Sequence, residues 1–135
     1  MSVIYFPGWR VHAYLDDDGQ NVLRRWLDKE GISAPDRAKL QTIIDMIEYG
    51  GPRTVAGTLR DVGSGFSVLV SGRKEGGDLS PVFCYGPFSE TEITFLVGAR
   101  LVRKHLTPSY AVGIAAERLE MLRQEPQRRR RERIT

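Results

Sequence analysis

The chain has 135 residues, of which 41% are hydrophobic and 27% are charged. This composition is typical of a globular domain and excludes a disordered, collagen-like or membrane-spanning chain, and the length leaves no room for a second folded domain. Cys84 is the single cysteine, which excludes an internal disulfide and a cysteine-rich zinc site.

The net charge of +3 is concentrated at the C-terminal end of the chain. Residues 125–135 hold five arginines against two glutamates, so residues 1–124 are formally neutral. A neutral body argues against tight nonspecific binding of nucleic acid by that body. We therefore predict a single domain over residues 1–124, followed by a basic mobile tail over 125–135 whose arginine run has no apolar partner.

The chain shows no pattern that would direct it to a membrane. Its first ten residues lack the basic stretch and apolar run of a secretion signal, and no later apolar run is long enough to cross a bilayer. We expect a cytoplasmic protein without membrane contact.

A strand is predicted at residues 9–14, where large or apolar residues alternate with more polar ones. The aspartates and glycine of residues 16–19 end this strand in a turn. A first helix follows around residues 22–27, which carry one apolar face, and Gly31 provides its stop.

A second helix is predicted to begin at the capping pattern of Ser33 and Asp36 and to end at Gly50. Its apolar residues repeat at helical spacing, which gives it one buried stripe. The two helices form an αα-hairpin that needs a sheet to cover.

Three β-branched and aromatic runs, at residues 66–71, 81–85 and 92–97, predict a twisted antiparallel β-meander with the helices packed on one face. Residues 53–65 are predicted to connect the second helix to this sheet, with a short strand around Thr58 and Leu59. Residues 99–106 are expected to be irregular.

A last helix is predicted to begin with Thr107 as its N-cap and Pro108 in its first turn. Its buried stripe comprises Val112, Ala115, Ala116, Leu119 and Leu122. The predicted class is therefore α+β, with an N-terminal strand, an αα-hairpin, a β-meander and a C-terminal helix.

The order of these elements and several local motifs resemble the RelE/HigB toxin superfamily, in its phage-derived branch, from about residue 9 to residue 122. The motifs are Trp9-Arg-Val-His-Ala-Tyr14 with Asp18-Gly19, the helix around Trp26-Leu27, Tyr49-Gly-Gly51, and Thr107-Pro108 leading into an Ala-rich helix with Arg118. The resemblance implies a RelE-like fold and a ribosome-associated mRNA endonuclease that blocks translation, with an antitoxin protein as its partner.

Such a nuclease works without a metal or cofactor. Attack by the 2′-hydroxyl of the RNA needs a proton acceptor, a cation near the phosphate and a proton donor to the leaving oxygen. The resemblance and this chemistry select Arg103, Lys104 and His105 as candidate catalytic residues, because they cluster just before the last helix. A solvated basic loop is the alternative interpretation of this segment.

Further cations are candidates for binding RNA. They are Arg73 and Lys74 in a predicted hairpin, Arg100, and the tail residues Arg128, Arg129, Arg130 and Arg131. His12 is predicted to lie on the sheet surface or partly buried rather than to act in catalysis.

A second hypothesis is a catalytically inactive, phage-encoded inhibitor that binds a host protein complex such as RNA polymerase. Val68-Leu69-Val70 stands where the resembled family commonly carries a Glu-Leu-Arg-like triplet, so the usual arginine is absent. A sheet with aromatic and β-branched strands can also serve as a docking surface. The sequence leaves open whether the chain is an enzyme.

Overall fold

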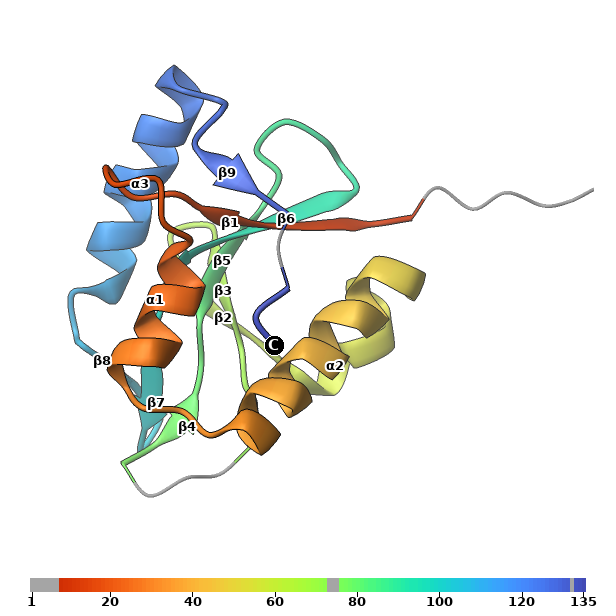
Figure 1. Ribbon diagram of the computed structural model, residues 1–135, viewed down its shortest axis with the longest axis vertical. Helices are drawn as coiled ribbons and strands as arrows, with labels where there is room; N and C mark the ends of the chain where they lie inside the picture. Colours follow the sequence, from red (N-terminus) through yellow and green to blue (C-terminus); the bar gives the residue numbers. More distant parts are fainter. Residues whose placement is uncertain (1–7, 73–75, 132) are drawn as a thin grey trace, which may run out of the picture.

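The structure, a computed structural model, describes residues 8–72, 76–131 and 133–135 (Figure 1). It belongs to the predicted α+β class, and its elements occur in the chain order β1 (Arg10–Tyr14), α1 (Val22–Lys29), α2 (Ala34–Gly50), the 3-10 helix η1 (Pro52–Thr58), β2 (Leu59–Gly63), β3 (Phe66–Leu69), β4 (Asp78–Leu79), β5 (Val82–Tyr85), β6 (Glu92–Val97), β7 (Arg100–Val102), β8 (His105–Thr107), α3 (Ala111–Gln124) and β9 (Arg129–Arg130).

The N-terminal strand and helices form where the sequence predicts them. Helix α2 begins after Ser33, whose Oγ accepts a hydrogen bond from the backbone N–H of Asp36 at 3.4 Å. It ends at Gly51, whose φ of 85° is a left-handed conformation that glycine adopts without strain. The capping pattern and the glycine stop are therefore confirmed.

The main sheet is mixed rather than wholly antiparallel. Its strand order is β2-β3-β5-β6-β1-β9. The strands β2, β3, β5 and β6 pair antiparallel, as a meander requires, whereas β1 runs parallel to β6 and antiparallel to β9. The N-terminal strand thus lies inside the sheet, between the meander and the C-terminal strand.

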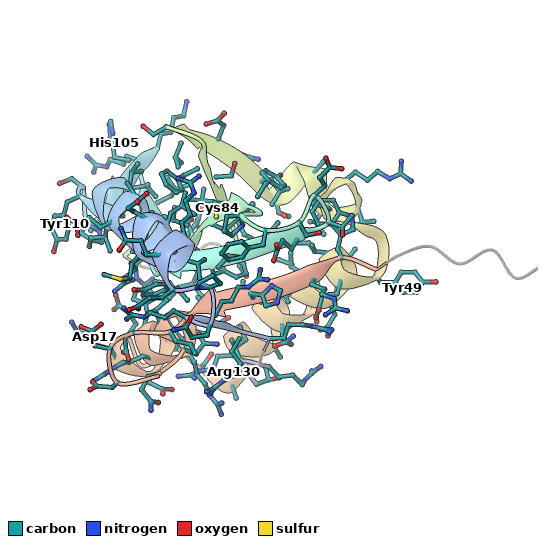
Figure 2. The ribbon with its side chains drawn as sticks, turned by 90° about the horizontal axis from the view of Figure 1, so that it is seen from above. Asp17, Tyr49, Cys84, His105, Tyr110 and Arg130 are labelled. Atoms are coloured by element: carbon teal, nitrogen blue, oxygen red, sulfur yellow. The ribbon has the colours of Figure 1, made fainter. Side chains whose placement is uncertain are left out.

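Helices cover both faces of this sheet, so the prediction of one covered face is wrong. Figure 2 shows α3 on one side of β1 and the helices α1 and α2 on the other. Strand residues alternate between two hydrophobic cores: Phe83 packs with α1 and α2, whereas its neighbours Val82 and Cys84 pack with α3. A sheet buried on both faces explains why all six residues of β6 are buried.

The prediction that residues 99–106 are irregular is also wrong. Strands β7 and β8 form a hairpin, and β4 adds to it to complete a second, three-stranded sheet. Val102 pairs with His105, so Arg103 and Lys104 form the two-residue turn, with φ values of 50° and 69°. A hairpin turn that follows the twist of its strands requires positive φ at both positions.

The last helix begins later than predicted. Thr107 ends strand β8, and α3 starts at Ala111 after Tyr110. Ala115 and Leu122 of the predicted stripe are buried, together with Ala111, whereas Ala116 is exposed.

The C-terminal segment packs on the body, which differs from the predicted mobile tail. Its strand β9 pairs with β1, and the side chain of Ile134 is 3% exposed in the core shared with α1 and α2. The backbone N–H of Ile134 donates to Oε1 of the buried Gln41 at 2.8 Å. Ile134 supplies the apolar anchor that the predicted tail lacked, and carboxylates of the body pair with its arginines.

We predict that Ile134→Ala lowers the free energy of unfolding by about 2 kcal/mol. This is the lower end of the range for truncating a buried isoleucine, because Ile134 lies one residue from the end of the C-terminal segment, where the backbone can relax around the smaller side chain. Urea unfolding followed by circular dichroism measures the change. Val102→Ala, on the exposed side of β7, is the control and should leave the midpoint nearly unchanged. An Ile134→Ala midpoint equal to that of the wild type would mean that the segment does not pack.

Candidate nucleic-acid interface

The N-terminus of α1 is held by Asn21, a buried residue that the sequence analysis did not single out. Its Oδ1 accepts hydrogen bonds from the backbone N–H groups of Leu23 and Arg24 at 2.9 and 3.1 Å. This cap satisfies two of the donors that a helix start leaves without partners. The cap fixes where the first turn of α1 points.

The first turn of α1 carries arginine and no acidic residue. Since a helix N-terminus is already electropositive, basic residues there are unfavourable unless an anion lies close by. Arg25 has such anions: its Nη1 lies 2.7 Å from Asp16 Oδ2 and 3.2 Å from Asp18 Oδ2. These hydrogen bonds raise the pKa of the Arg25 guanidinium above its ordinary value, so it stays charged.

Strand β9 brings a third arginine to the same place. Arg130 pairs with Ala13, whose side chain faces α1 and α2, so Arg130 reaches the same face of the sheet. In Figure 2 it lies below β1, on the side of these helices. Together these side chains surround an open hollow of about 360 Å³, here called the arginine hollow, which is lined by Gln20, Asn21, Arg24, Arg25, Asp28 and Arg130.

The arginine hollow has the donors of an anion site. Guanidinium groups bind phosphate through paired N–H donors. In the described part of the chain, Nδ2 of Asn21 has no hydrogen-bond partner, although Asn21 is 5% exposed. Leaving such a donor without a partner is costly. Asp28 is the one carboxylate among the described lining residues, and Arg37 Nη1 pairs with its Oδ1 at 2.7 Å.

Asp28 is the one described lining residue of the hollow that commonly transfers protons in enzymes. None of its described lining residues is a histidine, cysteine, serine or tyrosine, which are the usual nucleophiles and proton-transfer groups. Cys84 is buried away from it in the α3 core, and burial raises the pKa of that thiol to about 11.

A second polar cluster lies on the α3 face of the sheet, around His12. Glu92 is 2% exposed, and its Oε2 lies 3.3 Å from His12 Nδ1 and pairs with Arg129. Burial, followed by the charges of Arg129, Arg131 and Arg10, lowers the pKa of His12 to about 4. Glu92 favours the protonated imidazole, but Arg129 neutralises its carboxylate, so the lowering prevails.

We predict that the protein loses stability as the pH falls from about 6.5 to about 4. Over this interval the unfolded chain takes up a proton at His12 while the folded chain resists it, so protonation favours unfolding. His12→Gln should flatten the dependence of the unfolding free energy on pH, measured by urea titration at several pH values. His105→Gln, at an exposed histidine, should keep the wild-type slope. An unchanged slope in His12→Gln would show that His12 is not held neutral.

The residues selected from the sequence lie in several places. Arg103, Lys104 and His105 are exposed in the β7–β8 hairpin, and the two figures place this hairpin and His105 far from β9 and Arg130. Arg100 donates to the carbonyl of Gly77 at 3.1 Å and lies 3.9 Å from Glu30. Arg73 and Lys74 lie outside the described residues. The roles predicted for these six residues stay predictions.

The four tail arginines are held by different parts of the body. Arg128 pairs with Asp17 and Glu125, Arg129 with Glu92, and Arg131 with Glu48, while Arg130 lines the arginine hollow. Among the residues that the structure describes, no group of three side chains is arranged to hold a metal ion. In that same part of the chain, no helix is long and apolar enough to span a bilayer.

A family model described as the TilS substrate binding domain matches residues 20–61, roughly a third of the chain. The matched stretch contains α1, α2, η1 and the start of β2, and with them every described residue of the arginine hollow except Arg130. No curated protein and no solved structure matches the chain.

This match corrects the family predicted from the sequence. It points to a substrate-binding domain and not to the RelE/HigB superfamily, so that resemblance and the toxin endonuclease it implied are wrong. The alternative, a phage-encoded inhibitor of a host machine, has no support either. The motifs that suggested the superfamily are patterns of residue size and turn chemistry, which unrelated α+β folds share.

Arg24, Arg25 and Asn21 were not among the residues predicted from the sequence. The sequence does contain a pointer to them, because an asparagine cap followed by two arginines and no acidic residue is an unusual start for a helix. The contribution of Arg130 depends on the pairing of β9 with β1, and nothing in a local pattern indicates that pairing.

Proposed function

We propose that this chain is an RNA-binding module that seats a backbone phosphate of a structured RNA, such as a transfer RNA, in the arginine hollow. TilS is a tRNA-modifying enzyme, and the family model that residues 20–61 match is described as the TilS substrate binding domain. The observation that carries the proposal is that five of the six residues lining the arginine hollow lie inside the matched segment.

The packing of the C-terminal segment supports this proposal by changing where the charge lies. The body is neutral without residues 125–135, but β9 and the residues after it lie against the helices of the matched segment. Of the tail arginines, Arg130 therefore adds its charge to that of Arg24 and Arg25, while Arg129 lies on the α3 face. Local positive charge of this kind attracts RNA and orients it before contact.

The carboxylates near these arginines limit how strongly RNA can bind. Arg25 is held by Asp16 and Asp18, and Arg131 by Glu48, so each exchanges one anionic partner for another when a phosphate arrives. The phosphate in the hollow, together with one or two neighbouring phosphates of the RNA backbone, gives a slope of log affinity against log salt of about −2. We expect moderate affinity with a shallow salt dependence.

We predict that Arg24→Gln and Arg130→Gln each weaken binding to unfractionated tRNA about tenfold and make the salt slope shallower by about one. Asn21→Asp keeps the helix cap but replaces the Nδ2 donor with a carboxylate oxygen, so it should weaken binding without loss of stability. Fluorescence anisotropy at several salt concentrations measures both affinity and slope.

Lys104→Gln is the matched control, because it removes one exposed cation from the β7–β8 hairpin instead. It should leave affinity and slope close to those of the wild type. A larger loss in Lys104→Gln than in Arg24→Gln and Arg130→Gln would place the RNA on the hairpin and overturn the proposed site.

A further inference from the structure

A second hollow, larger than the first, opens where α2 ends beside the start of β1. Its volume is about 1070 Å³, and the described residues that line it include Trp9, Glu48, Tyr49, Gly51 and Arg53. This is enough room for a ligand the size of a nucleotide or more. Because of its aromatic walls it is called the aromatic hollow below.

Trp9 forms a fixed wall of the aromatic hollow. A Cβ atom on Gly51 would lie 2.8 Å from Trp9 Nε1, so the indole packs directly on the glycine backbone and no larger residue fits there. The ring also meets Tyr85 edge-on, with 6.5 Å between ring centroids. The indole is therefore oriented before any ligand arrives.

Tyr49 is the exposed aromatic of the hollow. It is 94% exposed, and Figure 2 shows its side chain pointing away from the body at the end opposite Asp17. A tyrosine ring gains little stability at such a position, because it buries almost none of its apolar surface. Stacking with the flat face of a ligand would cover this ring.

The charges beside the aromatic rings suit a nucleotide. Arg53 lines the hollow and is exposed, so it can meet a phosphate next to a stacked base. Glu48 lines it as well and pairs with Arg131 through Nε and Nη2 at 3.1 and 2.8 Å. A flat aromatic surface combined with a cation is the usual arrangement for an unpaired nucleotide.

The C-terminal segment joins the two hollows. Arg130 lines the arginine hollow, and the next residue, Arg131, pairs with Glu48, which lines the aromatic hollow. Ala13, opposite Arg130, lies four residues along the chain from Trp9, which is roughly 13 Å at the rise of a β-strand. Residues 48–53 also belong to the matched segment, so one RNA can reach both places.

We infer that the aromatic hollow takes an unpaired nucleobase of the RNA, stacked on Tyr49 and bounded by Trp9, with the neighbouring phosphate at Arg53. This inference rests on the proposed function and deepens it, since it makes the preferred ligand an RNA with an unpaired base near a structured stem. An RNA that is fully base-paired would occupy the arginine hollow and leave the aromatic hollow empty.

The test compares two labelled RNAs with the same stem, one closed by an unpaired loop and one fully paired. Wild-type protein should bind the looped RNA about tenfold more tightly in fluorescence anisotropy, and Tyr49→Leu should remove that preference. Tyr49→Phe, which keeps the ring, should retain it. Tyr110→Leu, which removes another exposed aromatic residue at the start of α3, should also retain it.

The outcomes separate this inference from the proposed function. Equal affinity of the wild type for the two RNAs, or an undiminished preference in Tyr49→Leu, would overturn the base site while leaving the phosphate site in place. Failure of the wild type to bind either RNA would overturn both. Thermal unfolding of each variant shows that it is folded, which is expected because both tyrosines are exposed.

Discussion

The pairing of the C-terminal strand β9 with the N-terminal strand β1 is the contact on which the rest of the arrangement depends. Two backbone pairs, Ala13 with Arg130 and Tyr14 with Arg129, join segments more than a hundred residues apart. Because side chains alternate along a strand, this short ladder sends Arg129 to Glu92 on the α3 face and Arg130 to the α1 face. Loss of the pairing between β1 and β9 would release the side chains of Arg129 and Arg130 from these positions.

Burial and charge act together to hold this segment. Ile134 fills a place in the core shared by α1 and α2, and carboxylates on the body meet the arginines before and after β9. Exposed ion pairs contribute little individually, and the desolvation of a buried pair such as Arg129 with Glu92 offsets much of its attraction, so the apolar contact of Ile134 should dominate. The ion pairs instead determine where each guanidinium points, which matters for a binding surface.

Sequence patterns predicted the local elements well. The alternation at residues 9–14 and the capping of Ser33 gave β1 and α2, because both depend on neighbouring residues. Three features were not predicted from the sequence. They are the parallel pairing of β1 with β6, the hairpin at Arg103 and Lys104, and the packing of Ile134. The first and third are contacts between distant parts of the chain, and the second lacks the asparagine or glycine that usually marks such a turn.

The candidate site was harder to predict, because its charge comes from two ends of the sequence. Arg103, Lys104 and His105 drew attention as a cluster along the chain, yet a hairpin turn accounts for their exposure and backbone conformation. Arg24 and Arg25 follow an unusual helix start, but only the cap of Asn21 and the pairing of β9 show that they lie beside Arg130. Residues 20–61, which match the family model described as the TilS substrate binding domain, contain Arg24 and Arg25 but not Arg130.

The most direct test of the account is a titration of isotopically labelled protein with tRNA, followed through its backbone amide resonances. Binding at the arginine hollow predicts that the amides of residues 20–25 and 128–131 shift together at the same RNA concentrations, since both segments contact one phosphate. Shifts confined to residues 99–107, or no shifts at all, would contradict it.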